Sequence, residues 1–177
     1  MAFNNSYKLF GEKGYHSNEP PFAQPVIVAD HILSPMNMGA VLRLAANIHA
    51  AKVWFVYDKD PGFRSYKIKN TSSGASEKTD WEMIEPGKLR DALPPDYDIV
   101  AIETTEDAQN IYDTPLPEKV VFIVGNERYG ISENILKLAG RKVFIPIPGI
   151  ISSLNVSHAL GISLFEWLRQ RQFKKNM

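Results

Sequence analysis

Short, uninterrupted apolar segments recur along the chain and limit what it can fold into. They occupy residues 26–29, 53–56, 99–102, 120–124 and 143–147. A strand without polar alternation must be buried on both faces, and a parallel sheet covered by helices provides that environment. The sequence therefore predicts an α/β fold, a mostly parallel sheet with helices on both faces. Ligands of such sheets bind beyond the carboxyl ends of the strands.

The segments between these strands predict the helices and the domain boundaries. Helical patterning covers residues 37–50, 86–93, 133–139 and 153–172. Asn37 is a candidate N-cap, Ser132 is placed to cap the third helix, and Gly140 to end it. Residues 58–80 are expected to be rich in loops. We expect an N-terminal arm over residues 1–25 and a single domain over residues 26–177.

Composition excludes several functional classes. The chain has 177 residues, 44% of them hydrophobic, and a formal net charge of zero, so any surface for nucleic acid must be local. It has no cysteine, and its four histidines are not spaced as metal ligands, so we expect no metal site. No apolar run approaches the length of a membrane span. We expect a cytoplasmic protein.

The first strand ends in an unusual sequence, DHILSPMNMG, which leads into a helix that carries Arg43. Pro35 disfavours helical geometry at Ser34, so the helix is expected to start after it. Arg43 has two interpretations from these residues alone. It extends to solvent beside its apolar neighbours, or it is a fixed cation directed at an anion.

A second strand is followed by GNERYGIS, residues 125–132. The sequence is a near miss for a phosphate-binding loop, because Ile131 stands where that loop requires lysine, and this excludes nucleoside triphosphate binding of that type. Its two glycines still allow the backbone to approach a ligand closely. Glu127 is either an acid near a helix N-terminus or part of a functional site.

The last strand is followed by PGIISSLNVS, residues 148–157. Its serines and asparagine offer more polar groups than one helix cap requires. Together with the apolar Ile145, Ile147 and Leu154 they suggest a pocket for a polar ligand. No GxGxxG or GxSxG follows a strand, which argues against a dinucleotide site and against an α/β-hydrolase.

These three segments, in this order, resemble the three motifs of the SpoU/TrmH branch of the SPOUT RNA methyltransferases. The matching residues are 34–45, 123–132, and 145–148 with 153–157, and residues 71–75 resemble a small-residue patch of the same family. The resemblance covers roughly residues 25–170. It departs from the family at Asn126, where a serine is frequent, and at His158, where small residues are common.

The resemblance implies a fold and an activity beyond what the residues alone establish. It implies a deep trefoil knot at the C-terminal end, S-adenosylmethionine bound in a bent shape, and methylation of a ribose 2′-oxygen in RNA. It also implies a homodimer with the active site at the subunit interface. A dimer would use the apolar stripe Leu160, Leu164, Phe165 and Leu168, although burial within one chain accounts for that stripe equally well.

The resemblance also implies roles for individual residues. Arg43 takes the activating role at the ribose, and because the pKa of arginine exceeds about 12, we favour a charge stabiliser or phosphate clamp over a general base. The residues expected to orient Arg43 and the ribose are Asn37, Glu127, Ser153 and Asn155. The residues expected to contact the cofactor are Thr104, Gly125, Asn126, Ile145, Ile147, Ser153 and Leu154.

RNA contact is expected from local basic surface. The main candidates are Arg43, Arg64, Lys67 and Lys69, with Tyr66 available to stack on a base. A C-terminal set, Arg169, Arg171, Lys174 and Lys175, is equally consistent with a solvated face.

Two alternatives stay open. The chain could be an RNA-binding protein of this fold without turnover, or a methyltransferase that acts on a base atom. The spacing of Asn37 and Arg43, together with SLNVS, favours ribose. The sequence does not distinguish transfer RNA from ribosomal RNA, nor does it specify the nucleotide.

Overall fold

A seven-stranded sheet forms the centre of the computed structural model, which describes residues 6–13 and 22–173. The strand order is β3-β2-β1-β6-β4-β7-β5, and every pairing between these named strands is parallel. The strands are β1 (Val26–Asp30), β2 (Lys52–Val56), β3 (Trp81–Ile84), β4 (Asp98–Ile102), β5 (Gln109–Asn110), β6 (Val120–Val124) and β7 (Arg141–Phe144). The predicted parallel sheet is confirmed.

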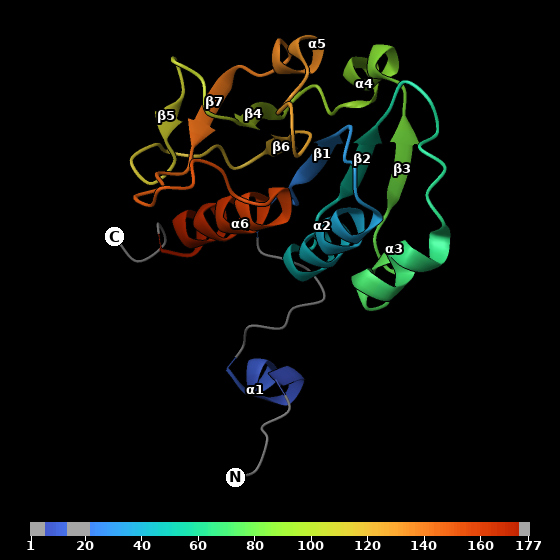
Figure 1. Ribbon diagram of the computed structural model, residues 1–177. Helices are drawn as coiled ribbons and strands as arrows, with labels where there is room; N and C mark the ends of the chain where they lie inside the picture. Colours follow the sequence, from blue (N-terminus) through green and yellow to red (C-terminus); the bar gives the residue numbers. More distant parts are fainter. Residues whose placement is uncertain (1–5, 14–21, 174–177) are drawn as a thin grey trace.

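Helices cover both faces of the sheet, as predicted (Figure 1). One face carries α2 (Pro35–Ile48), α3 (Ser65–Ser72) and α6 (Val156–Phe173), and the other carries α4 (Pro86–Ala92) and α5 (Glu133–Leu136). The uninterrupted apolar strands supply both cores. In β1, Ile27 and Ala29 pack with residues of α2 and α6, whereas Val26 and Val28 pack with residues of α4 and α5.

The two central strands end side by side and create the place for a site. Ala29 of β1 pairs with Val124 of β6, so the loops that follow them leave the sheet at the same level. The chain then passes from β1 into α2 on one face and from β6 into α5 on the other. Such a divergence at the carboxyl ends of parallel strands opens a crevice in which ligands bind.

The first helix of the sheet domain begins earlier than expected. Ser34, not Asn37, is the N-cap of α2, and its hydroxyl accepts a hydrogen bond of 3.2 Å from the Met36 backbone N–H. Pro35 occupies the first helical position, where its missing N–H costs nothing and its fixed φ suits the helix. Asn37 lies inside the first turn, which leaves its side chain available for the site described below.

The interval expected to be rich in loops contains regular structure instead. Residues 58–80 include α3 and the short 3₁₀ helix η1 (Ala75–Glu77), and β3 follows directly. The sequence of α3 lacks an apolar stripe at helical spacing, because only Ile68 and Ser72 of this helix are buried. The strand β5 was not predicted either, since two residues are too few to show a pattern of apolar residues.

Three predicted ends are wrong by a few residues. Helix α5 ends at Leu136, and the Gly140 N–H donates to the carbonyl of Ile99 in the sheet rather than closing a longer helix. Strand β7 ends at Phe144, because prolines at 146 and 148 have no N–H to donate to a ladder. Helix α6 begins at Val156, which leaves residues 145–155 as an irregular connection.

The expected N-terminal arm contains one short helix, α1 (Ser6–Glu12). The rest of the arm, apart from Lys13 and residues 22–25, lies outside the described residues. In the part of the chain that the structure describes, no helix combines the length and the apolar character needed to cross a membrane.

Close packing of α2 on α3 requires a glycine at position 39, and this can be tested. A Cβ atom there would lie 2.6 Å from the Thr71 Cβ and 2.8 Å from the Ile68 carbonyl oxygen. We expect Gly39→Ala to lower the free energy of unfolding in urea by about 1–3 kcal/mol. The matched control is Gly87→Ala in α4, where a Cβ meets no atom within 4 Å. That change should be neutral or stabilising by up to about 1 kcal/mol. Equal effects of the two substitutions would contradict the packing argument.

Candidate active site

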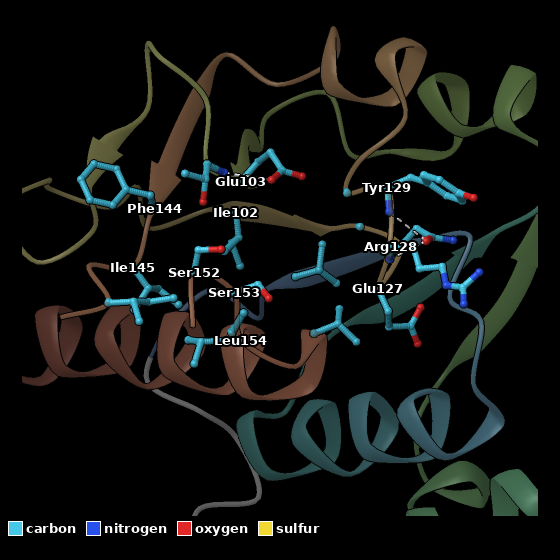
Figure 2. Close-up of a pocket in the computed structure, with 18 residues that line it drawn as sticks. Ile102, Glu103, Glu127, Arg128, Tyr129, Phe144, Ile145, Ser152, Ser153 and Leu154 are labelled. Atoms are coloured by element: carbon cyan, nitrogen blue, oxygen red, sulfur yellow. Dashed lines mark hydrogen bonds between the residues drawn. The ribbon is translucent and has the colours of Figure 1, made fainter. Parts of the chain in front are cut away.

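A pocket lies at the carboxyl ends of β4, β6 and β7 (Figure 2). Its volume is about 440 Å³, within the range typical of small-molecule sites. The segments that line it are residues 102–104, 124–130, 144–145 with Ile147, and 152–154 with Val156 and Ala159. Three loops from separate parts of the sequence therefore meet around one cavity, as the order of the strands requires.

All seven residues predicted to contact a cofactor line this pocket. They are Thr104, Gly125, Asn126, Ile145, Ile147, Ser153 and Leu154. The apolar side chains of Ile145 and Ile147 are only partly buried, so they offer a surface for a flat apolar group. The hydroxyls of Ser153 and its neighbour Ser152 lie on the same cavity. This mixture suits a ligand that has both an aromatic part and polar groups.

Gly125 is required by the fold of its own loop. A Cβ atom at this position would lie 2.2 Å from the Gly130 carbonyl carbon and 2.3 Å from the Ile131 nitrogen. No side chain fits such a close approach of backbone to backbone. The loop therefore closes on itself, with the Asn126 N–H donating to the Gly130 carbonyl at 2.9 Å and the Gly130 N–H returning a bond of 3.0 Å.

Glu103 holds the loop after β6 against the end of β4, and the sequence analysis missed it. One carboxylate oxygen accepts a hydrogen bond of 2.9 Å from the Ile131 N–H. The other accepts a bond of 2.9 Å from the N–H of Thr104. The available signal was an acidic residue directly after a buried strand, at the edge of the sheet where ligands bind.

Glu127 connects three segments that are distant in the sequence. Its carboxylate accepts hydrogen bonds from the Leu33 N–H at 2.8 Å and from the Asn37 side-chain amide at 2.6 Å. The side-chain oxygen of Asn37 in turn accepts a bond of 3.1 Å from the Asn155 side-chain amide. Three of the predicted catalytic residues are therefore joined in one network beside the pocket, and Ser153 lines the pocket itself.

Asn155 also accounts for part of the abundance of polar residues before α6. Its side-chain oxygen accepts bonds from the N–H and the hydroxyl of Ser157, so Asn155 is the residue that caps this helix. Ser152 and Ser153 are not needed for capping. They remain exposed on the pocket, where they are available to a ligand.

Arg43 lies apart from this network. Its side chain is exposed, and its guanidinium donates a hydrogen bond of 3.3 Å to the Ser73 hydroxyl at the end of α3. Arg43 is six residues beyond Asn37 on α2, which separates the two by about 9 Å along the helix axis. Among the described residues, no hydrogen bond joins Arg43 to Asn37, Glu127 or Asn155. The orientation of Arg43 by these residues is thus not observed within one chain.

The other expected RNA-binding cations lie on α3 or at its start. Arg64 and Lys67 are exposed, whereas Lys69 forms an ion pair of 3.0 Å with Glu77. Arg43 reaches the same helix through Ser73, so these cations share one side of the domain.

Two arginines of the C-terminal set have structural partners. Arg169 forms a two-pronged pair with Glu166, and Arg171 donates to the Leu116 carbonyl. Lys174 and Lys175 lie outside the described residues.

A pair of acidic residues around His31 links the ends of β1 and β2. The carboxylate of Asp30, 0% exposed, accepts bonds of 2.6 Å from both His31 Nδ1 and the Ser132 N–H. His31 Nε2 lies 3.1 Å from the carboxylate of Asp58. Burial acts to lower the pKa of His31, but the bonds and charges of Asp30 and Asp58 outweigh it and raise the pKa above 6.5. His31 adopts a left-handed φ of 50°, and its carbonyl accepts a bond from Asn126.

Known proteins share this fold and these motifs. Residues 24–165 match the model of the SpoU rRNA Methylase family. The tRNA (guanosine(18)-2′-O)-methyltransferase of Aquifex aeolicus is 31% identical over 84% of this chain and 71% of its own length. The 23S rRNA (guanosine-2′-O-)-methyltransferase RlmB of Xylella fastidiosa is 33% identical over 82% of this chain. This chain spans only 59% of the length of that second relative.

A solved structure supports the fold. The SpoU methyltransferase AviRb of Streptomyces viridochromogenes, in complex with the cofactor AdoMet, superposes with a TM-score of 0.72 at 24% identity, covering 87% of this chain and 60% of that one. The fold and the pocket thus define a parallel α/β protein with a small-molecule site at a switch point of its sheet. The chain belongs to the SpoU methylase family.

The raised pKa of His31 predicts a pH-dependent contribution to stability. Because the folded state favours the protonated imidazole, the contribution is fully present below the unfolded pKa of about 6.5 and is lost as pH rises through the higher folded value. We compare wild type with His31→Asn, since asparagine tolerates a left-handed φ. The difference in free energy of unfolding should be constant below about pH 6.5 and should shrink as the pH rises above that value. The same substitution at the exposed His158 controls for loss of an imidazole. A difference independent of pH would show that the two carboxylates do not stabilise His31 in its charged form.

Proposed function

We propose that the protein is an S-adenosylmethionine-dependent RNA methyltransferase that modifies a ribose 2′-hydroxyl in transfer or ribosomal RNA. The observation that carries the proposal is the Asn37–Glu127–Asn155 network at the rim of a cofactor-sized pocket. The names of the two relatives, one a tRNA and one an rRNA ribose methyltransferase, agree with it but do not choose between the substrates.

The pocket offers suitable groups to each part of the cofactor. Ile145, Ile147 and Leu154 provide apolar contact for an adenine, while the loop that begins at Gly125 forms another wall of the same pocket. Bound S-adenosylmethionine would present a methyl group on a sulfonium, so that attack of an oxygen on the methyl carbon would break the carbon–sulfur bond and leave a neutral thioether. The carboxylates of Glu103 and Glu127 near the pocket suit a cationic ligand.

The protein must then position the ribose hydroxyl and stabilise the charge that develops as its proton passes to water or to the adjacent phosphate. Each oxygen of Glu127 already accepts one hydrogen bond, so its role is to orient Asn37 and, through it, Asn155. Arg43 carries the positive charge. Its guanidinium stabilises the developing alkoxide or clamps the adjacent phosphate, because a group with so high a pKa is a poor base.

We propose that Arg43 reaches the site of a partner subunit in a homodimer. Arg43 does not line the pocket of its own chain and instead contacts Ser73. Around the network, Met36 is 64% exposed and Ile150 is 100% exposed, which is unusual for such side chains unless another surface covers them.

The apolar stripe of α6 gives this dimer less support than the sequence suggested. Leu160 and Leu164 are fully buried within one chain, and Leu168 is partly buried against the same core. Phe165 alone of that stripe is exposed.

The trefoil knot is likewise a proposal. After β7 the chain passes the loops that follow β4 and β6 to reach α6. The far end of α6 is bonded to the segment between β5 and β6: Trp167 donates to the Pro117 carbonyl, and Gln170 accepts from Leu116. These contacts at the far end of α6 support threading through the preceding segments. A crystal structure traced continuously through residues 103–173 checks it.

We place the protein in the cytoplasm, together with its RNA substrate.

Two other functions compete with this proposal. A non-catalytic RNA-binding protein of the same fold would bind no S-adenosylmethionine, which calorimetry measures directly. A base methyltransferase would bind the cofactor but leave ribose unmodified. Mass spectrometry of nucleosides, after incubation of the protein with cofactor and RNA from a strain that lacks the gene, distinguishes ribose from base methylation.

Substitution of Arg43 tests its role in charge stabilisation. We expect Arg43→Ala to lower the single-turnover rate about 10²–10³-fold with little change in cofactor affinity, because the interaction acts in the transition state. Arg43→Lys should be nearly as slow, since a point charge does not replace a planar fork. Leu42 and Ala45 keep α2 packed, so the melting temperature should be retained. Arg90→Ala on α4 is the control. A wild-type rate for Arg43→Ala would disprove the assigned role.

Mixed dimers test whether Arg43 acts across the interface. Arg43→Ala removes the cation, and Leu154→Lys replaces an apolar contact by a positive charge in the cofactor pocket, which repels the sulfonium. Each variant alone should be inactive. A heterodimer, purified through two different tags, should recover about half the activity of wild type, because one of its two sites is complete. An inactive heterodimer would place Arg43 in its own site. Sedimentation of the wild type as a 19.9 kDa monomer would exclude the dimer itself.

A further inference from the structure

The loop after β6 ends in a tight turn, residues 126–130, whose shape is fixed by an unusual number of hydrogen bonds. Asn126 and Gly130 pair as an isolated antiparallel bridge, and Gly130 has a φ of +70°. The Asn126 side-chain oxygen accepts bonds from the N–H groups of Arg128 and Tyr129 at 2.8 and 3.2 Å. Its amide donates to the His31 carbonyl at 2.7 Å. The turn is therefore held rigidly on the end of β1.

This rigid turn presents an aromatic ring and a cation to solvent. Tyr129 is 83% exposed, well above the exposed aromatic side chains of Tyr66, Tyr112 and Phe165. Arg128 is exposed, and no carboxylate of the described residues lies within ion-pair distance of it. Figure 2 shows both side chains extending from the turn away from Ile102 and Ile145. Both residues belong to the rim of the pocket, but no side-chain hydrogen bond or ion pair of the described residues engages the Tyr129 hydroxyl or the Arg128 guanidinium.

The turn lies directly beside the groups proposed to hold the ribose. Glu127, which precedes Arg128, accepts the hydrogen bond from Asn37, and the same turn lines the pocket. Arg128 is the only basic residue among the described residues that line this pocket. A nucleotide adjacent to the methylated one would come within reach of a ring and a guanidinium that extend from a backbone fixed in place.

We propose that Tyr129 and Arg128 form a platform for the substrate RNA, on which a nucleobase stacks on the Tyr129 ring while Arg128 binds a neighbouring phosphate. This inference rests on the proposed function and adds the residues that hold the RNA close to the reacting ribose. Aromatic rings bind unpaired bases of any sequence by stacking, and arginine binds phosphate with paired N–H donors. Because the turn is rigid before RNA binds, little conformational freedom is lost on binding.

Arg128 and Tyr129 are better placed to contact RNA near the pocket than the cations predicted on α3. Lys69 is already paired with Glu77, and neither Arg64 nor Lys67 lines the pocket. Those residues serve long-range attraction of RNA. Arg128 and Tyr129 would act at the target itself.

The test compares Tyr129→Ala, Tyr129→Phe and Arg128→Ala with wild type. The substrate is total RNA from a strain that lacks the gene, with radiolabelled S-adenosylmethionine as methyl donor. Tyr129→Ala should raise KM for RNA about tenfold, because one stacked base is lost, while kcat and cofactor affinity stay unchanged. Tyr129→Phe keeps the ring and should retain the wild-type KM. Arg128→Ala should raise KM and reduce the salt dependence of RNA binding by about one phosphate contact. Tyr112→Ala, at another exposed tyrosine, is the matched control.

Three results would overturn the platform. The first is a wild-type KM for Tyr129→Ala. The second is an equal defect in Tyr129→Phe and Tyr129→Ala, which would assign the effect to the hydroxyl. A shift of Tyr129→Ala from dimer to monomer in sedimentation would show that the ring belongs to a protein interface instead. If the wild type itself transfers no methyl group, the proposed function fails. Retention of the same RNA on filters by wild type and Tyr129→Ala still tests the platform in that case.

Discussion

The carboxylate of Glu127 is the interaction on which the arrangement of the site depends. It accepts one hydrogen bond from the backbone before α2 and one from the side chain of Asn37 within α2. Asn37 in turn accepts a hydrogen bond from Asn155, which lies at the start of α6. Three stretches of chain that are distant in the sequence are thereby fixed relative to one another. Removal of this one acceptor would leave two donors without a protein partner and release both helix starts at once.

Side-chain carboxylates from other segments also fix the loop that carries Glu127. Its backbone N–H groups are satisfied by side chains from other segments: Ile131 by Glu103 after β4, and Ser132 by the fully buried Asp30 at the end of β1. Gly125 permits the close return that brings those N–H groups into place. A loop held from both neighbouring strands is rigid, and a rigid loop positions a cofactor and a substrate without losing conformational entropy when they bind.

The sequence predicted the sheet well, because β1 and β6 are buried on both faces, and uninterrupted apolar residues of this length suit a strand covered on both sides. It predicted the pocket from the position of polar and glycine residues after strands. It failed where structure depends on contacts rather than periodicity. Helix α3 has a mostly polar surface, β5 has two residues, and Glu103 acts on a segment that lies 28 residues further along the chain.

Arg43 shows most clearly why the sequence alone did not predict the geometry of the site. The motif groups it with Asn37, since the two are six residues apart, but a helix places residues at that spacing on different sides. The guanidinium accordingly contacts Ser73 of α3, while Asn37 faces Glu127 and Asn155. The prediction treats Arg43 and Asn37 as neighbours in the site because they are close in the sequence. Within a single chain the two side chains do not meet.

The distribution of charge completes the physical argument. With a net charge of zero, the molecule does not attract RNA as a whole, so attraction depends on where its cations lie. Inside the pocket, the carboxylates of Glu103 and Glu127 outnumber the single cation Arg128, and this favours a ligand that carries a sulfonium. Outside it, Arg43 and the exposed residues of α3 favour an anionic polymer. With two carboxylates to one guanidinium, the pocket has an excess of negative charge, while Arg43, Arg64 and Lys67 lie outside it. That uneven distribution allows one small domain to bind a cationic cofactor and a polyanion side by side.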